Sequence, residues 1–139
     1  MPETTMDIEP IVEEWYEYLA KGEMKGLKCK ECGTVMFPPT PVCRACGCMD
    51  TEWVDEPGTG HLVSVTLSPQ GIPYHSTEPC VSGWAVLDDG NRFCAVLDDV
   101  DREGALDLIA RMHDGEVRIE LYVAPLDGGY YFPRMRVVS

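Results

Sequence analysis

Five of the seven cysteines of this chain fall within the twenty residues of CKECGTVMFPPTPVCRACGC, residues 29–48. Four of them form two pairs with the spacing Cys-x2-Cys, Cys29 with Cys32 and Cys43 with Cys46, and a glycine follows each pair. A glycine at that place permits the tight turn in which backbone N–H groups point at the thiolate sulfurs. Two such turns brought together form a tetrahedral site of four thiolates. The spacing therefore predicts a metal centre built from these four cysteines.

Zinc is the metal expected at this centre, and iron is the alternative because it accepts the same four ligands. A site closed by four protein ligands leaves no open position for a substrate, so it stabilises its module and catalyses nothing. A redox pair of the thioredoxin type occurs once and opens a helix, whereas this pair is repeated in a Pro-rich loop. The acidic start MPETTMDIEP lacks the apolar segment of a secretory signal. We therefore expect a cytoplasmic protein, in which thiols stay reduced and bind metal rather than form disulfides.

The charge of the chain argues against nucleic acid and membrane partners. The formal net charge is −13 over 139 residues, and the sequence contains no run of Lys or Arg. Nucleic acid binding draws most of its affinity from cations that neutralise phosphates, so this chain is poorly suited to it. The longest apolar run, CVSGWAVL at residues 80–87, is far shorter than the about 20 residues that a membrane helix needs.

A helix is predicted ahead of the metal centre, in DIEPIVEEWYEYLAKG at residues 7–22. Its apolar residues recur every three or four positions, which is the spacing of one helix face. This face either packs on the protein's own body or docks on a partner. Because the metal module is too small to cover it, we take docking as the hypothesis. The contact residues would be Trp15, Tyr16 and Leu19.

From Gly60 onward the sequence takes on the alternation of β-strands. Strands are predicted at 61–67, at 80–99 as a hairpin that turns at Asp89-Gly90, at 115–123 and at 130–139, with a helix at 102–112. The order β-β-β-α-β-β is that of a five-stranded OB barrel whose helix lies between its third and fourth strands. Within the hairpin we expect Trp84 to be a buried aromatic.

The chain as a whole resembles a two-module family, the rubredoxin-like zinc ribbon plus OB-fold proteins that accompany thiolases. The segments that carry the resemblance are EWYEYLAKGEMKGLKCKECGTVMFPPTPVCRACG, TEWVDEPGTGHLVSVT and CVSGWAVLDDGNRF. The loop SPQGIPYHSTEPC and the C-terminal YYFPRMRVVS match the family only loosely. The resulting fold expectation is mainly β, with an N-terminal docking helix in 1–24, a rubredoxin-like zinc ribbon in 25–56 and a five-stranded OB-fold domain with one helix in 57–139.

The function that the resemblance implies is that of a non-catalytic accessory subunit. Its partner would be a thiolase-superfamily enzyme acting on acyl-CoA: a thiolase, an enzyme similar to hydroxymethylglutaryl-CoA synthase, or an aldolase of the steroid type. The zinc ribbon and helix would dock on that enzyme, and the OB barrel would complete or gate its acyl-CoA channel. We therefore expect a hetero-oligomer with acyl-CoA at the shared interface.

The loop after the first barrel strand has two possible roles. In OB folds this loop borders the binding face, so Tyr74 and His75 are further candidates for partner contact. Alternatively, His75 and Cys80 form a nucleophilic dyad of a free-standing enzyme similar to an acyl thioesterase. No pattern supplies an orienting carboxylate or an oxyanion hole, so we expect no catalytic residues. Arg134 and Arg136 are the few candidates for contact with CoA phosphates, and an OB-fold nucleic-acid-binding protein is the remaining rival.

Overall fold

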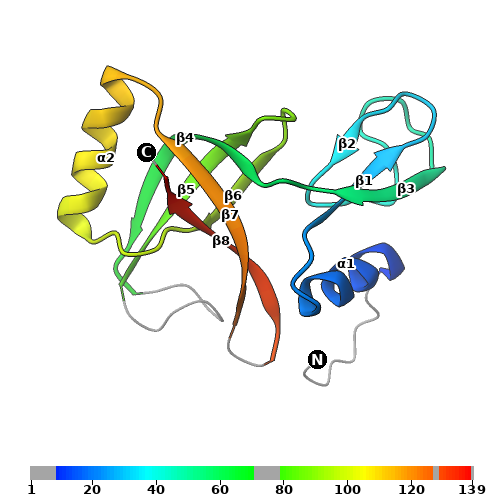
Figure 1. The fold of residues 1–139 in the computed structure, drawn as a ribbon, viewed down its shortest axis with the longest axis horizontal. Helices are drawn as coiled ribbons and strands as arrows, with labels where there is room; N and C mark the ends of the chain where they lie inside the picture. Colours follow the sequence, from blue (N-terminus) through cyan, green and yellow to red (C-terminus); the bar gives the residue numbers. More distant parts are fainter. Residues whose placement is uncertain (1–8, 71–78, 127–128, 139) are drawn as a thin grey trace.

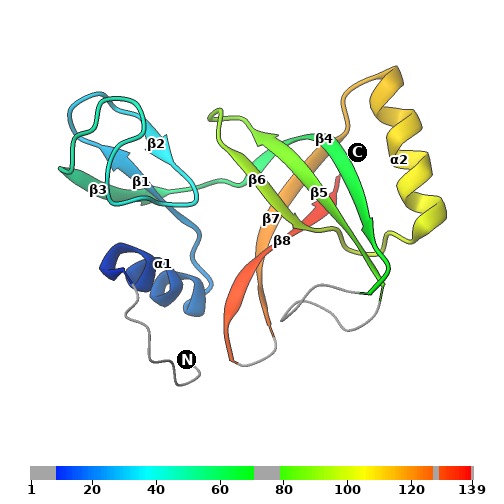
Figure 2. The same cartoon turned by 180° about the vertical axis from the view of Figure 1, so that it is seen from behind.

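Two antiparallel sheets and two helices make up the part of the protein that the structure describes (Figure 1). The structure is a computed structural model, and it describes residues 9–70, 79–126 and 129–138. A small three-stranded sheet with one helix lies on one side, and a five-stranded sheet with the second helix lies on the other (Figures 1 and 2). The mainly β fold predicted from the sequence is confirmed.

The N-terminal part consists of helix α1 (Pro10–Ala20) and the sheet that carries the cysteines. The Glu9 carboxylate caps α1 by accepting hydrogen bonds from the backbone N–H groups of Ile11 and Val12, which have no partner within the helix. The chain leaves α1 through Gly22, whose φ of 80° suits glycine. Strand β1 (Lys25–Cys29) then pairs with β2 (Val35–Met36) on one side and with β3 (Thr51–Asp55) on the other.

The C-terminal part is the predicted OB barrel. Its elements are β4 (Thr59–Ser68), β5 (Cys80–Leu87), β6 (Arg92–Val96), α2 (Arg102–Asp114), β7 (Arg118–Pro125) and β8 (Tyr131–Val137). The strands lie in the order β6-β5-β4-β7-β8. A parallel bridge between Leu97 and Met135 joins the two ends of the sheet, with a hydrogen bond of 2.9 Å from the N–H of Asp98 to the Met135 carbonyl. Helix α2 covers the side of the barrel away from the ribbon (Figures 1 and 2).

One aromatic cluster connects helix α1, the ribbon and the barrel. The Trp15 ring meets Phe37 edge-on at 5.7 Å and Phe132 of β8 at 5.8 Å, between ring centroids. Phe37, which follows β2, stacks on Phe93 of β6 at 4.9 Å. The indole N–H of Trp15 also donates to the Lys25 carbonyl at 3.0 Å. Trp15 and Phe37 thereby belong to the core of the barrel, while the ribbon keeps a smaller buried cluster of its own, Leu27, Cys29, Met36 and Cys43. The sequence did not predict this connection.

The hypothesis that α1 presents Trp15 and Leu19 to a partner is wrong. Trp15 is 4% exposed and Leu19 is 0% exposed, and both belong to the main hydrophobic core. The helix lies beside β8 (Figure 1), so the barrel, and not the metal loop alone, covers its apolar face. The remaining predicted contact residue of this helix, Tyr16, is partly buried against the same core.

The prediction that Trp84 is buried is also wrong. Its side chain is 46% exposed, because it points from β5 to the outside of the barrel. Two apolar residues of α2 are likewise exposed, Leu106 at 60% and Ile109 at 37%. The buried face of α2 is formed by Ala105 and Leu108. In the described residues, neither helix has the length and apolar content that would be needed to cross a membrane.

Candidate metal centre and exposed apolar face

The four predicted metal ligands meet at one point at the edge of the small sheet. The Sγ atoms of Cys29, Cys32, Cys43 and Cys46 all lie within 4.8 Å of one another. Cys29 is the last residue of β1, and the other three lie in the loops on either side of β2. Cys29 and Cys43 are buried, whereas Cys32 and Cys46 are exposed. The centre is thus held from the inside by one cysteine of each pair and closed from the outside by the other.

The two cysteine turns repeat the same backbone hydrogen bonds. In the first turn, the N–H of Cys29 donates to the Thr34 carbonyl and the N–H of Gly33 donates to the Cys29 carbonyl, each at 2.9 Å. In the second turn, Cys43 donates to Cys48 and Gly47 donates to Cys43, also at 2.9 Å. Gly33 and Gly47 have φ values of 78° and 79°, which residues other than glycine rarely adopt. The glycine after each pair is therefore required by the turn itself.

The spacing of the sulfurs fits a zinc ion. Cys29 Sγ lies 3.6 Å from Cys46 Sγ, and Cys32 Sγ lies 3.6 Å from Cys43 Sγ. Zn–S bonds of about 2.3 Å in a tetrahedron place sulfurs about 3.8 Å apart. All four cysteines are free of disulfides, and a set of four thiolates is the usual donor set of structural zinc. The predicted zinc cofactor is supported by both the geometry and the chemistry of the site.

The thiols of the centre differ in how readily they ionise. The pKa of Cys32 is lowered to about 6, first by its hydrogen bond with the Thr34 hydroxyl. At Cys46 the backbone N–H of Cys48 lowers the pKa, but contact with Cys29, burial and the other two thiols outweigh it and raise the pKa to about 12. Four thiols this close resist ionising together unless a cation joins them. A bound metal supplies that cation.

The described residues among the other candidates for chemistry are buried or already paired. Cys80 is buried at the start of β5, so its thiol is not presented to a substrate. Its suggested partner His75 lies outside the described residues, as does Tyr74. Arg134 is hydrogen-bonded to Asp98 at 2.7 Å, and Arg136 is paired with Glu120. The two arginines considered for phosphate contact therefore already hold carboxylates of their own chain.

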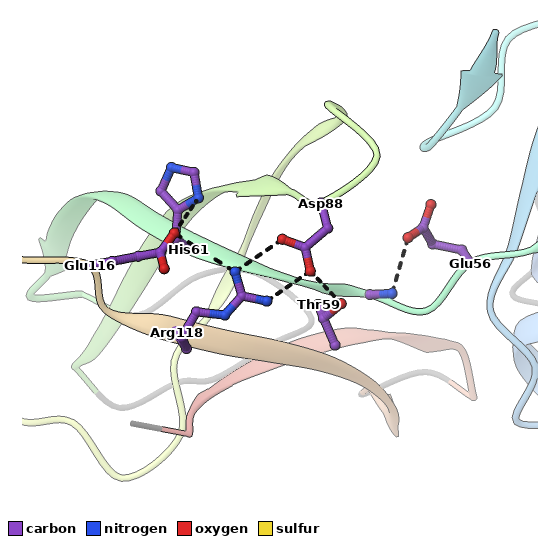
Figure 3. Close-up of polar contacts among 7 residues, drawn as sticks. Glu56, Thr59, His61, Asp88, Glu116 and Arg118 are labelled. Carbon is purple, nitrogen blue, oxygen red and sulfur yellow. Dashed lines mark hydrogen bonds and ion pairs between the residues drawn. The ribbon is translucent and has the colours of Figure 1, made fainter.

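A polar network on the barrel is likewise structural (Figure 3). The Arg118 guanidinium donates two hydrogen bonds, of 3.0 and 2.7 Å, to the Asp88 carboxylate, which also accepts one of 2.9 Å from the Thr59 hydroxyl. These bonds lower the pKa of Asp88 to about 2, Arg118 contributing most. Glu116 pairs with Arg118 at 3.8 Å and with His61 at 3.5 Å. The network joins β4, β7 and the β5–β6 hairpin.

The largest departure from the sequence predictions is an exposed apolar face around Trp84. On the outside of the sheet Trp84 stands between Ser64 of β4 and Cys94 of β6, its direct cross-strand neighbours. Ser64 also lines a groove with Val63, Val65, Ile109, Met112 and His113, where α2 meets β4. We use the name Trp84 face for the surface formed by Trp84, Ser64, Cys94, Val63 and Ile109.

Comparison with known proteins agrees with this architecture. Residues 17–47 match the family described as ChsH2, rubredoxin-like zinc ribbon domain. A DUF35 domain-containing scaffold protein of Pyrococcus furiosus is 30% identical over 92 residues, which cover 64% of this chain and 65% of that protein. The alignment thus spans a little less than two thirds of the relative's length.

Two solved structures have a similar fold. The structure of an Ltp2-ChsH2(DUF35) aldolase superposes with a TM-score of 0.72 at 21% identity and covers 97% of this chain and 98% of that one. A DUF35 family protein of unknown function from Sulfolobus solfataricus superposes with a TM-score of 0.54 at 13% identity, over 93% and 86% of the two chains. The resemblance to zinc ribbon plus OB-fold proteins is thereby confirmed, and the four-cysteine centre is a zinc site.

Proposed function

We propose that this zinc ribbon and OB-fold chain is a non-catalytic accessory subunit of a thiolase-superfamily enzyme that acts on acyl-CoA. It would complete or gate the enzyme's acyl-CoA channel. Two similarities support this class of function: the Pyrococcus relative is named a scaffold protein, and the chain of similar fold belongs to an Ltp2-ChsH2 aldolase. The observation on the chain itself that carries the proposal is the exposed Trp84 in the middle of a barrel strand.

The position of Trp84 favours a binding role. OB folds bind their ligands on the face formed by their second and third strands, which are β5 and β6 here. An aromatic side chain that is 46% exposed at the centre of that face is costly to leave in water. Large aromatic residues are also the usual hot spots of protein interfaces. The face continues through Ser64 to the groove lined by Val63 and Ile109, so it offers a partner more apolar contact than the Trp84 ring alone.

The charges around the Trp84 face favour a partner enzyme over a second copy of this chain. Arg92 stands one row from Trp84 on the same side of β6 and makes no ion pair with any described residue. It would therefore be free to meet a carboxylate of the partner. Two copies of this chain would each bring a net charge of −13 to the contact, which opposes self-association. The partner surface we expect is apolar with an acidic rim.

Co-purification tests this assignment. The tagged protein should retain a thiolase-superfamily enzyme, and Trp84→Ala should lose it, with affinity reduced about a hundredfold for a loss of about 2.7 kcal/mol. The matched control is Tyr131→Ala, which removes an aromatic ring of similar exposure from the α1 side of the barrel. If Tyr131→Ala loses the enzyme and Trp84→Ala keeps it, the docking surface lies beside α1. If no enzyme of this superfamily co-purifies with the wild type, the proposed function is wrong.

Kinetics with the isolated partner test the catalytic part of the proposal. The pure chain should not turn over acyl-CoA, whereas adding it to the partner enzyme should raise that enzyme's kcat/KM. The Trp84→Ala variant should need a much higher concentration to produce the same effect, because the substitution weakens binding but removes no catalytic group. Turnover of acyl-CoA by the pure chain would instead support the free-standing enzyme considered from the sequence.

A further inference from the structure

Glu56 is a buried carboxyl at the point where the chain passes from the ribbon to the barrel. It follows the last residue of β3 and precedes β4, and it is 5% exposed. Its Oε1 accepts a hydrogen bond of 3.0 Å from the N–H of Gly58 (Figure 3). Its Oε2 is buried and no N–H or O–H donor reaches it, the one such side-chain atom in the part of the chain that the structure describes. An ionised carboxylate in this place would lack the donors that it needs.

The group that contacts the Glu56 side chain is another carboxyl, that of Asp89. Asp89 lies in the turn between β5 and β6, and its Oδ1 accepts a hydrogen bond of 3.0 Å from the N–H of Asn91. Two ionised carboxylates have acceptors only, so a hydrogen bond between them requires one proton. The two carboxyls can thus hold one proton between them. Glu56 comes from the ribbon side of the junction and Asp89 from the barrel side.

The surroundings place the proton on Glu56. Burial first, and the bond with Asp89 second, raise the pKa of Glu56 to about 8. At Asp89 burial opposes the charge, but the bonds from Glu56 and Asn91 and the nearby charge of Arg44 outweigh it and lower the pKa. Glu56 accepts one hydrogen bond from the backbone, whereas several groups stabilise the charge of Asp89. Asp89 is therefore the ionised member of the pair and Glu56 the protonated one.

The junction has a second attachment on the same hairpin. The Asn91 side chain donates to the Val35 carbonyl at 3.0 Å and accepts from the N–H of Phe37 at 3.2 Å. Asn91 and Asp89 therefore hold the two sides of the ribbon, Asn91 at β2 and Asp89 at the end of β3. We propose that Glu56 and Asp89 share one proton that fastens the ribbon to the barrel, and that its release weakens this attachment.

The other charged groups around the pair have partners of their own. Asp88, the neighbour on the hairpin, has its pKa lowered to about 2 by Arg118 and Thr59. Asp55, the neighbour in β3, is paired with Lys25 of β1, and Arg44 of the ribbon donates to the Val35 carbonyl at 3.4 Å. His61 belongs to the adjoining network through Glu116, and histidine side chains change charge within the physiological range of pH. Any comparison must therefore cancel the contribution of His61.

The direction of the pH dependence follows from the raised pKa of Glu56. The folded protein keeps a proton that the unfolded chain releases at its ordinary Glu pKa of about 4.3. The contribution to stability is complete below that value, decreases as the pH rises, and is lost once the pH has passed the folded pKa of about 8. Unfolding near neutral pH should thus release about one proton from this pair. Ordinary paired carboxylates behave in the opposite sense.

The test is urea unfolding of the full zinc-loaded chain from about pH 6.5 to about pH 9.5, where the cysteines keep their metal. The wild type should lose stability with rising pH, and Glu56→Gln should lose the part of this slope that corresponds to about one proton. Asp88→Asn is the control for loss of a neighbouring carboxylate: Asp88 is ionised throughout this range, so the variant should keep the one-proton slope. Since His61 interacts with Asp88, the deciding comparison is between the wild type and Glu56→Gln, in which Asp88 and His61 are both intact and cancel.

Infrared spectroscopy gives a readout that a merely structural role of Glu56 would not change. At about pH 7 the wild type should show the carbonyl band of a protonated carboxylic acid, and the band should disappear as the pH is raised. Asp89→Asn should lack it as well, because an amide can donate to an ionised Glu56. If Glu56→Gln does not fold, Asp89→Asn and the wild-type titration decide the question. Absence of the band in the wild type at neutral pH would overturn the proposal, as would a wild-type slope in Glu56→Gln.

Discussion

Among single residues, Asn91 is the most unusual, because its side chain hydrogen-bonds to the backbone of β2 and of the residue after it, in the other sheet. Strand β2 has only two residues, and Asn91, at 1% exposure, pairs with the backbone groups of Val35 and Phe37. Buried backbone groups without partners cost about 1–3 kcal/mol each. No sequence pattern indicates this contact, since an Asn after Asp89-Gly90 is accounted for by the turn alone.

The metal ligands are the residues that the sequence could predict, and a pair of serine variants tests them. Cys43→Ser should give a chain without zinc, because a buried ligand is lost from a site that contributes about 10–16 kcal/mol to folding. Cys48→Ser should keep one zinc per chain, because its sulfur lies outside the cluster and instead accepts the N–H of Asp50 at 3.3 Å. Metal analysis of the purified proteins measures both. A Cys43→Ser chain with a full equivalent of zinc would contradict the ligand assignment.

The exposure of Trp84 could not be predicted from the spacing of residues in the sequence. The cysteines were predictable because a metal fixes the distance between its ligands whatever else the chain does. Trp84 lies in CVSGWAVL, a run of mostly apolar residues without clear alternation, so the sequence does not tell which side chains face inward. A bulge between Leu62 and Ser64 changes the register of the neighbouring strand as well. The face that a strand residue occupies is decided by such irregularities.

At the scale of elements, helix α1 was correctly predicted and its packing surface was not. The three- and four-residue spacing of apolar residues defines the face of the helix, but it does not identify what covers that face. The covering residues are Phe132 of β8, more than a hundred positions along the chain, and Phe37 after β2. Contacts of this kind depend on the closure of the barrel, which no local pattern describes.

The two tryptophans should therefore respond oppositely to truncation. Trp15→Ala removes a core aromatic and the hydrogen bond to Lys25, so we expect the free energy of unfolding to fall by about 3–5 kcal/mol. Trp84→Ala removes an exposed ring, and its effect on stability should stay within about 0.5 kcal/mol. Urea unfolding followed by circular dichroism measures both. Equal losses in the two variants would mean that Trp84 is buried or that α1 is not docked on the barrel.

For the whole molecule, the important feature is that the ribbon and the barrel are not independent. The sequence boundaries 1–24, 25–56 and 57–139 remain our proposal for its modules. The core, however, runs across them through Trp15, Phe37, Phe93 and Phe132. The barrel would expose Phe93 and Phe132 if the ribbon unfolded. Loss of the metal should thus destabilise the barrel as well as the ribbon.

Removal of zinc tests this dependence. Chelation should unfold the ribbon and lower the unfolding midpoint of the barrel in the same step, because two buried aromatic rings lose their cover. Unfolding of the zinc-loaded protein should be a single transition by far-UV circular dichroism and by tryptophan fluorescence. Trp15 and Trp53 report the ribbon side and Trp84 reports the barrel. A barrel that melts at the same midpoint with and without zinc would show that the two parts fold separately.

The shared aromatic core has a consequence for how such chains can recombine. Ribbons and barrels look like interchangeable parts. In a hybrid of two relatives, however, the residues at positions 15 and 37 would come from one protein and those at positions 93 and 132 from the other, and the four side chains must still pack together. Hybrids that exchange all four positions together should fold, and hybrids cut at the linker alone should not. We therefore expect the ribbon and the barrel to be exchanged between relatives only when these four residues remain compatible, a requirement that the linear sequence does not mark.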